Sequence, residues 1–491
     1  MRCVSVPRRA SRYSTWAPAG TCRAFGPSRP PSERATSSTW CSGQRARSTA
    51  RRSGPRASGV DGGYDVSISR GRLLLILGIA VHLVFLASLI APSHFLNPLF
   101  IEGTHNLEEG QGSDFYAFYQ AGRYVLDGED IYQRPMDDPD RVVPYAYFYR
   151  YLPFVAYTLG VALNALPPRA SYWFWVAVVE VVLLLCVLAT RRMATDDDLG
   201  CSLAAMWLLF SPFYIEQYMG QLTFVMAALT FAFVVTYSRG QTVRAEWSWI
   251  ASVIVKHLTV LYVPIFVRLR RFRPVLLAGA LLILTTVPYF AFRDAGVDQF
   301  SHDNFNLSLT PMPGNLGLVS LMMTLKDRFF PGASEPFGSI QGIKLSMTRI
   351  MVLVTMLAPL LTGLWVTFRR KPVDLVELVS LWTMTYFMVF REVWEYHYVL
   401  MMPVLVLLYA RTRARILWLF FALLAIPTPF VFYDVPGPNP QVHWSAFEHV
   451  LNHSFKIVPL VGLFIWVAAG YARRHARRLD ARPDDGLAVT L

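Results

Sequence analysis

Apolar side chains are gathered into runs of about 17–22 residues that recur along most of the chain, each long enough to cross a hydrocarbon core roughly 30 Å thick. Runs of this length indicate membrane-spanning helices rather than buried helices of a soluble protein. The pattern therefore predicts an all-α, polytopic transmembrane helix bundle. About ten full spans are expected, at residues 73–91, 171–190, 199–215, 221–237, 274–292, 347–368, 374–390, 396–410, 414–432 and 456–472.

Basic residues mark one end of these runs, and short basic loops lie on the cytoplasmic side of membranes. They occur at Arg70/Arg72, Arg191/Arg192, Arg239/Arg244, Arg268–Arg273, Arg369–Lys371, Arg411–Arg415 and Arg473–Arg478. Residues 92–150 carry ten acidic residues against four arginines, which favours the outer side. By parity, the loops 293–346 and 433–455 also fall outside, and the C-terminal tail 476–491 is cytoplasmic.

Two further apolar segments do not fit as full spans. Segment 247–267 has basic loops on both flanks, so both of its ends should lie inside. Splitting it at Lys256-His257 gives two helices about 15 Å long, which predicts a hairpin that dips into the membrane with these residues at its tip. Segment 151–166 ends at Pro167-Pro168 and should be a short embedded helix. Broken helices at membrane depth line cavities, so both segments indicate a site.

Composition supports the membrane assignment: 54% of the residues are hydrophobic and 16% charged, against roughly 25% charged in soluble domains. The net charge of +13 comes mostly from residues 1–60, which hold twelve arginines and one acid, Glu33. Because this basicity lies in one tail, we exclude nucleic acid as a partner.

The chain thus divides into a tail (1–66), a membrane domain (67–475) and the C-terminal tail. Residues 1–66 are Arg- and Ser-rich without apolar periodicity, and we expect them to be disordered. Their composition is that of an organelle transit peptide. Because transit peptides are more often amphipathic, we favour a later translation start at a non-ATG codon, near Val60 or Val66.

The cysteines form no CxxC motif and no metal-ligand spacing, so neither a disulfide nor a structural zinc is expected. His449 and His453 have the i, i+4 spacing of a zinc site and lie near His443, but no HExxH pattern completes it. Ordinary interfacial histidines are the preferred interpretation.

Polar residues that could carry chemistry stand at the predicted outer junctions and at the hairpin tip. Asp114 begins an amphipathic segment that we expect to lie as a helix on the membrane surface; alternatively, Ser113 or Asp114 is simply its N-cap. Arg150 and Tyr151 could equally belong to an interfacial belt, and Lys256 could snorkel. The other candidates are His257, Gln221, Asn315 and His397.

The order of these features resembles the GT-C class of polyprenyl-phosphate-sugar-dependent glycosyltransferases, most closely glycosyltransferase family 87, which includes mycobacterial-type alpha-mannosyltransferases. The resemblance rests on Asp114-Phe115-Tyr116, Gly128–Tyr132, Tyr151-x-Pro153, Gly220-Gln221, Lys256, Gly314-Asn315 and His397. The chain departs from it where Leu152, Leu316 and Tyr396 stand in place of residues that the family often has.

The resemblance implies transfer of one sugar, with mannose expected, from a polyprenyl-phosphate donor to a hydroxyl of a glycolipid or polysaccharide on the outer face of the plasma membrane, with inversion. Asp114 is then the catalytic base, and Lys256, His257 and Arg150 bind the donor phosphate. The sugar or acceptor is contacted by Tyr151, Gln221, Asn315 and His397. One phosphate balanced by lysine and histidine calls for no metal or other cofactor.

A transporter or lipid flippase is the alternative, because broken helices and a lysine at membrane depth could form a substrate pathway. The spans show no internal repeat, and the polar candidates gather on one predicted side of the membrane. The sequence therefore favours an enzyme over a transporter.

Overall fold

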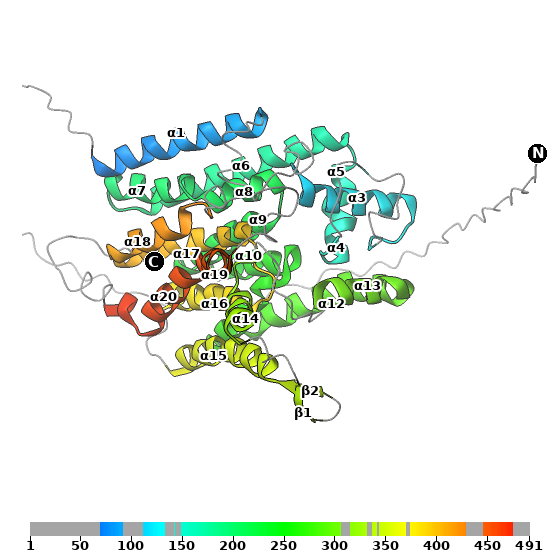
Figure 1. Cartoon of the computed structure of the whole chain (residues 1–491). Coiled ribbons are helices and arrows are strands. Elements are labelled where there is room, and N and C mark those ends of the chain that lie inside the picture. Colours follow the sequence, from blue (N-terminus) through cyan, green and yellow to red (C-terminus); the bar gives the residue numbers. More distant parts are fainter. Residues whose placement is uncertain are drawn as a thin grey trace, which may run out of the picture. The chain divides into compact units, whose positions relative to one another are not determined.

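The computed structural model of the chain is built almost entirely of helices (Figure 1), which confirms the all-α prediction. It describes residues 69–91, 111–132, 142, 149–305, 315–330, 336–340, 343–369, 374–428 and 445–474. All of these belong to one unit, Val66–Leu491. The predictions for residues 1–66 and 476–491, and for parts of the three outer loops, lie outside the described residues.

The helices of the first half of the chain are α1 (Arg70–Ile90), α3 (Ser113–Asp127), α4 (Pro153–Val155), η3 (Ala156–Gly160), α5 (Val161–Leu163), α6 (Pro168–Met193), α7 (Asp197–Leu208), α8 (Ser211–Met219) and α9 (Thr223–Ser238). Next come α10 (Thr242–Val255), η4 (His257–Tyr262), α11 (Val263–Arg268), α12 (Phe272–Phe292), α13 (Asp294–Phe305) and α14 (Leu318–Phe329). The C-terminal part holds α15 (Met347–Arg369), α16 (Leu375–Val389), η6 (Glu395–Leu400), α17 (Met401–Thr412), α18 (Ile416–Ala425), α19 (Ala446–Ser454) and α20 (Ile457–Ala468). Among the described residues, strands occur only in the hairpin of β1 (Pro336–Ile340) and β2 (Ile343–Ser346).

Four of these helices, α1, α6, α12 and α15, are long and apolar enough to cross a membrane. The pairs α7–α8 and α19–α20 are bent by 43° and 40° and could each form one broken span, which gives four to six spans by length and composition. The chain is thus a multi-pass membrane protein. The other apolar helices are shorter, so the count of ten full spans stays a prediction.

The expected span at 199–215 is broken in two. The helix α7 ends at Leu208 and α8 begins at Ser211, with a proline in its first turn. Proline fits the first turn of a helix but cannot continue a preceding one, because it lacks the N–H group and its ring clashes with the previous turn. The break therefore follows from Pro212.

The predicted hairpin at 247–267 has its break where the sequence places it. The helix α10 ends at Val255, Lys256 is extended (φ −154°, ψ 111°), and the 3₁₀ helix η4 follows from His257. This break takes the Lys256 side chain out of the helical register and turns it toward α8, α9 and η6. How deep the hairpin lies in a membrane remains a prediction.

The predicted short helix at 151–166 is also present, as the continuous stretch α4, η3 and α5. It packs against α3 with backbones in direct contact: a Cβ atom on Gly122 would lie 2.1 Å from the carbonyl carbon of Gly160. Ten of the fifteen residues of α3 are buried by this and other packing. The helix expected on a membrane surface is therefore enclosed by the protein itself on most sides.

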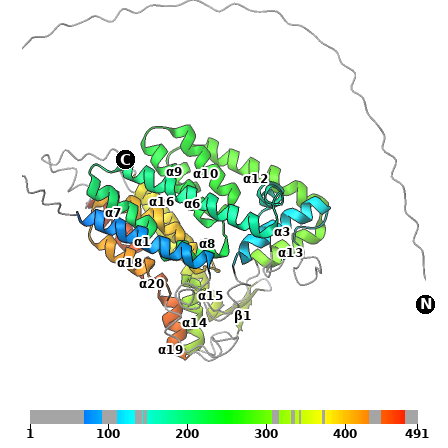
Figure 2. The ribbon, with the colours of Figure 1, turned by 90° about the horizontal axis from the view of Figure 1, so that it is seen from above.

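Three of the predicted cytoplasmic loops meet at one end of the bundle. Asp197 pairs with Arg72 at 3.0 Å and with Arg191 at 2.9 Å, and Asp196 lies 3.7 Å from Arg413. Both views show α1 alongside α7 (Figures 1 and 2). Exposed ion pairs of this kind contribute at most about 1 kcal/mol each, so they report on placement more than on stability.

Candidate functional site

Gln221 is the centre of the candidate site. It stands between α8 and α9 and is 4% exposed. Its amide nitrogen donates a short hydrogen bond to the carboxylate of Asp114, and its amide oxygen accepts one from the hydroxyl of Tyr151. The ammonium of Lys256 lies 3.5 Å from the same oxygen. One side chain thus joins residues from α3, the loop before α4 and the break after α10.

Lys256 is surrounded by polar and aromatic groups rather than exposed by snorkelling. Its Nζ donates to Oγ1 of Thr223 at 2.9 Å and lies 3.4 Å from Nε2 of His397. The rings of Tyr151 and Tyr396 have their centroids 5.6 and 5.7 Å from Nζ. Aromatic faces attract cations, so both rings favour the charged form of the lysine.

Asp114 does not cap its helix. The helix α3 begins at Ser113, its N-cap is Gly112 in the left-handed region (φ 76°), and no side chain makes a cap hydrogen bond. The carboxylate is directed to Gln221 instead. Burial raises the pKa of Asp114, while the hydrogen bond from Gln221 and the charges of Lys256 and Arg150 oppose this increase. A carboxylate with a raised pKa and a fixed orientation is suited to accept a proton.

His397 and Lys256 face each other as two hydrogen-bond donors. The backbone N–H of Trp394 donates to Nδ1 of His397 at 3.0 Å, so a neutral imidazole carries its hydrogen on Nε2. An ammonium group also has donors only. With this tautomer, Nζ of Lys256 and Nε2 of His397 lie 3.4 Å apart and neither can accept from the other. An anionic oxygen placed beside both would accept a hydrogen bond from each.

Arg150 lies beside this cluster but is already paired. Its guanidinium forms a short ion pair with Glu392, with the two side chains 40% and 22% exposed. Its charge still acts on Asp114. Arg150 is therefore close enough to assist an anion at the cluster, although Glu392 neutralises part of its field.

Asn315 and His257 are placed differently from the central group. The amide of Asn315 bonds backbone groups of the 391–397 turn: it donates to the carbonyl of Arg391 and accepts from the N–H of Val393 at 3.1 Å. His257 follows Lys256 directly at the start of η4. A contact of either residue with a substrate stays a prediction.

Three residues of the cluster were not among the candidates from the sequence: Thr223, Glu216 and Tyr396, which was noted only as a departure from the family pattern. Glu216 is 1% exposed and accepts a hydrogen bond from the backbone N–H of Phe224 at 2.6 Å. Its acidic side chain directly follows the apolar run 199–215 and is the signal that could have identified it, since ionisable residues at membrane segments are functional candidates. Thr223 and Tyr396 carry no such signal.

The histidines near the C-terminus do not form a cluster in the described part of the chain. Nδ1 of His453 lies 3.3 Å from the Ser320 hydroxyl and also contacts the carbonyl of Asn315, and His443 is outside the described residues. Among the residues that the structure describes, no three His, Cys, Asp or Glu side chains gather as metal ligands would.

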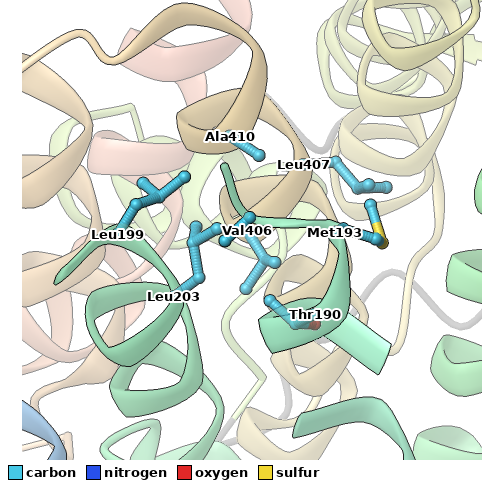
Figure 3. Close-up of a pocket in the computed structure, with 8 residues that line it drawn as sticks. Thr190, Met193, Leu199, Leu203, Val406, Leu407 and Ala410 are labelled. Carbon is cyan, nitrogen blue, oxygen red and sulfur yellow. The ribbon is translucent and has the colours of Figure 1, made fainter. Parts of the chain in front are cut away.

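A small apolar pocket lies elsewhere, between α6, α7 and α17 (Figure 3). Its volume is about 10 Å³, which is room for a single water. The hydroxyl of Thr190, its one polar lining group, accepts a hydrogen bond from the indole of Trp207 at 2.9 Å. The pocket therefore offers no group for chemistry.

Comparison with known proteins identifies a family. A model of glycosyltransferase family 87 matches residues 149–390. A search of curated proteins gives no match. The matched range contains Arg150, Tyr151, Gln221, Lys256, His257 and Asn315, whereas Asp114 and His397 lie outside it. The structure nevertheless brings Asp114 and His397 together with Gln221 and Lys256.

Proposed function

Because the chain belongs to glycosyltransferase family 87 through residues 149–390, it is a membrane glycosyltransferase, and we propose that its donor is a polyprenyl-phosphate sugar. Mannose is the expected sugar, and the acceptor is a hydroxyl of a glycolipid or polysaccharide. Transfer takes place on the outer face of the plasma membrane and inverts the anomeric configuration.

The observation that carries this proposal is the bonding of Gln221 to Asp114 on one side and its proximity to Lys256 on the other. Transfer needs a base for the acceptor hydroxyl and positive charge for the departing phosphate. Here the carboxylate of Asp114 and the ammonium of Lys256 both contact the side chain of Gln221. The cluster also combines residues from inside and outside the family match.

In the proposed reaction the acceptor oxygen forms a bond to the anomeric carbon while the bond from that carbon to the phosphate oxygen breaks. Asp114 takes the hydroxyl proton, and the phosphate leaves with the bonding electrons. The facing donors of Lys256 and His397 suit an oxygen of this phosphate, because Lys256 has a third hydrogen besides those directed to Thr223 and Gln221, and Nε2–H of His397 faces an ammonium that cannot accept. A single phosphate held in this way requires no metal ion.

The remaining candidates are assigned supporting roles. Arg150 and His257 assist the donor phosphate. Tyr151, Gln221 and Asn315 contact the sugar or the acceptor, and the bond between Tyr151 and Gln221 would be exchanged for bonds to sugar hydroxyls.

The proposed topology keeps ten spans and two embedded segments. The meeting of the loops of Arg72, Arg191 and Arg413 on Asp196 and Asp197 supports a common side for these loops, since ion pairs cannot join opposite faces of a membrane. This side is cytoplasmic by its basic charge. The cluster around Gln221 then lies toward the outer face.

The test is transfer of labelled sugar in membranes that contain the protein, supplied with polyprenyl-phosphate-mannose and with other polyprenyl-phosphate sugars. The variant Asp114→Asn should reduce transfer by roughly 10²-fold or more at equal protein level. Asp127→Asn is the matched control, because Asp127 is an exposed carboxylate on the same helix whose ion pair among the described residues is with Arg123.

Activity that survives in Asp114→Asn would contradict the assignment of the base. Failure of every donor with wild-type protein would contradict the proposed reaction, and movement of a labelled lipid across the membrane would then favour a transporter or flippase.

A further inference from the structure

A buried ion pair outside the family match joins the C-terminal helix to the turn that carries His397. Nζ of Lys456 lies 3.4 Å from Oε1 of Glu395, and the two side chains are 0% and 7% exposed. Glu395 is the first residue of η6, and His397 is the third. Lys456 immediately precedes α20.

The ammonium of Lys456 and Oε1 of Glu395 each have further partners within the protein. Lys456 donates to the carbonyl of Leu424 at 2.7 Å and to that of Ile426, in addition to Glu395. Glu395 also accepts from the backbone N–H of Thr428 at 3.0 Å. With its three donors used in this way, the lysine has no hydrogen left for a ligand.

Burying two charges costs several kcal/mol per ion, and apolar residues of the same volume often stabilise a protein equally well. The pair is therefore not explained by stability alone. What it fixes is the place where η6 starts, against the end of α18 and the start of α20. The residue before Glu395 is Trp394, whose backbone N–H donates to Nδ1 of His397 at 3.0 Å.

We propose that Lys456 and Glu395 are positioning residues that hold the imidazole of His397 beside Lys256. The role of His397 in this inference rests on the proposed function, whereas the placement of its imidazole does not. The proposal gives the start of α20 a role in the site, although α20 lies outside the residues that match the family.

The test compares two buried ion pairs of the C-terminal segment. The double variant Glu395→Gln/Lys456→Met removes both charges, so neither is stranded. The matched control is Glu377→Gln/Arg473→Met, which removes the buried pair between α16 and the residues after α20. Both variants should be produced in the membrane at wild-type level.

The first readout is the rate at which diethyl pyrocarbonate modifies His397, followed by mass spectrometry of its peptide. His397 is 5% exposed, so its modification in the wild-type protein requires local opening. We expect the rate to rise about tenfold in the Glu395/Lys456 variant, which corresponds to about 1.4 kcal/mol of easier opening, and to stay unchanged in the control. An unchanged rate in both would overturn the proposal, whatever reaction the protein catalyses.

The second readout is sugar transfer in a double-mutant cycle with His397→Ala. If the pair acts through His397, its removal should lower transfer about tenfold in the wild-type background and have no further effect once His397 is absent. Equal losses in both backgrounds would indicate a merely structural role.

Two more variants complete the design. Lys456→Arg keeps the charge and should retain wild-type modification and transfer. If the double variant fails to fold, Glu395→Gln gives a second test of the same contact: it leaves Lys456 with its two carbonyl partners but without its counter-ion, so the modification rate of His397 should again rise.

Discussion

The side-chain amide of Gln221 donates to the carboxylate of Asp114, a residue 107 positions earlier in the chain. The same amide presents its oxygen to Tyr151 and Lys256. The proposed base and the proposed phosphate-binding cation are therefore oriented by one group. Any substitution of Gln221 should therefore alter the orientation of both Asp114 and Lys256.

Gln221→Leu should shift the pH dependence of transfer. A base works only when deprotonated, so the rate falls as pH drops through the pKa of Asp114. Burial raises that pKa, which places the acid limb of kcat/KM above the ordinary carboxyl pKa of 3.8. Removing the hydrogen bond to the charged form should raise the pKa further and move the limb to higher pH.

A pH profile of transfer from pH 4 to 9 measures this shift. The matched control is Gln217→Leu, since Gln217 is a buried glutamine of α8 whose amide bonds Glu180 at 2.8 Å instead. A limb that stays in place in Gln221→Leu, or that moves to lower pH, would exclude Asp114 as the titrating base.

Lys256→Met should reduce transfer by roughly 10²–10³-fold, the usual loss when one donor to a developing negative charge is removed. Thr223→Val removes only the hydroxyl that accepts from Lys256 at 2.9 Å, and should cost about tenfold or less. Lys256→Arg keeps the charge and tests whether geometry matters in addition. Kinetics at varied donor concentration separate an effect on KM from one on kcat. Normal transfer in Lys256→Met would mean that the lysine contributes only to packing.

Substitutions of Arg150 and of Glu392 should change the KM for the donor in opposite directions. Arg150→Gln should raise the KM for the donor, whereas Glu392→Gln should lower it by releasing the guanidinium from its ion pair. Each effect should stay below about tenfold, because partly exposed pairs contribute about 0–1 kcal/mol. Equal increases of the KM in both variants would show that the pair only shapes the loop.

The sequence predicts the helices of this fold well and their bends less well. Each of the ten predicted spans overlaps at least one described helix, but 199–215 covers both α7 and α8, and 396–410 covers both η6 and α17. The last residues of 414–432 lie outside the described residues. The break at Lys256 was predictable because this charged residue lies in an apolar segment whose two ends are both predicted on the cytoplasmic side. The break after Leu208 was missed, since apolar residues continue on both sides and only Pro212 signals it.

The burial of α3 could not be predicted either. An amphipathic pattern shows that one face is covered, but not that a second helix covers the other. Here the 153–163 stretch packs against α3 because two glycines allow their backbones to meet.

The site was predictable where a residue's chemistry conflicts with its surroundings. Lys256 in an apolar run is such a case, and the family resemblance added Asp114, Gln221 and His397. The contact of Thr223 with Lys256 arises from the packing of α9 against η6 and the break after α10, and no local pattern encodes such packing. The same holds for Tyr396, whose ring lies beside the lysine.

The crossing of α3 over η3 gives a stability prediction that is independent of the reaction. Gly122→Ala would place a Cβ atom 2.1 Å from the carbonyl carbon and 2.3 Å from the carbonyl oxygen of Gly160. Neither backbone can yield without moving α3, and with it Asp114. We expect a loss of about 1–3 kcal/mol or more from this overpacking.

Thermal unfolding in detergent, with Gly279→Ala as the control, measures the effect. Gly279 is also helical, in α12, but a Cβ atom there meets nothing within 4 Å. That variant should keep or slightly increase the stability, because alanine favours a helix over glycine by up to about 1 kcal/mol. A Gly122→Ala protein that unfolds at the wild-type temperature would mean that α3 and η3 cross at a greater distance. The placement of Asp114 against Gln221 would then require a different support.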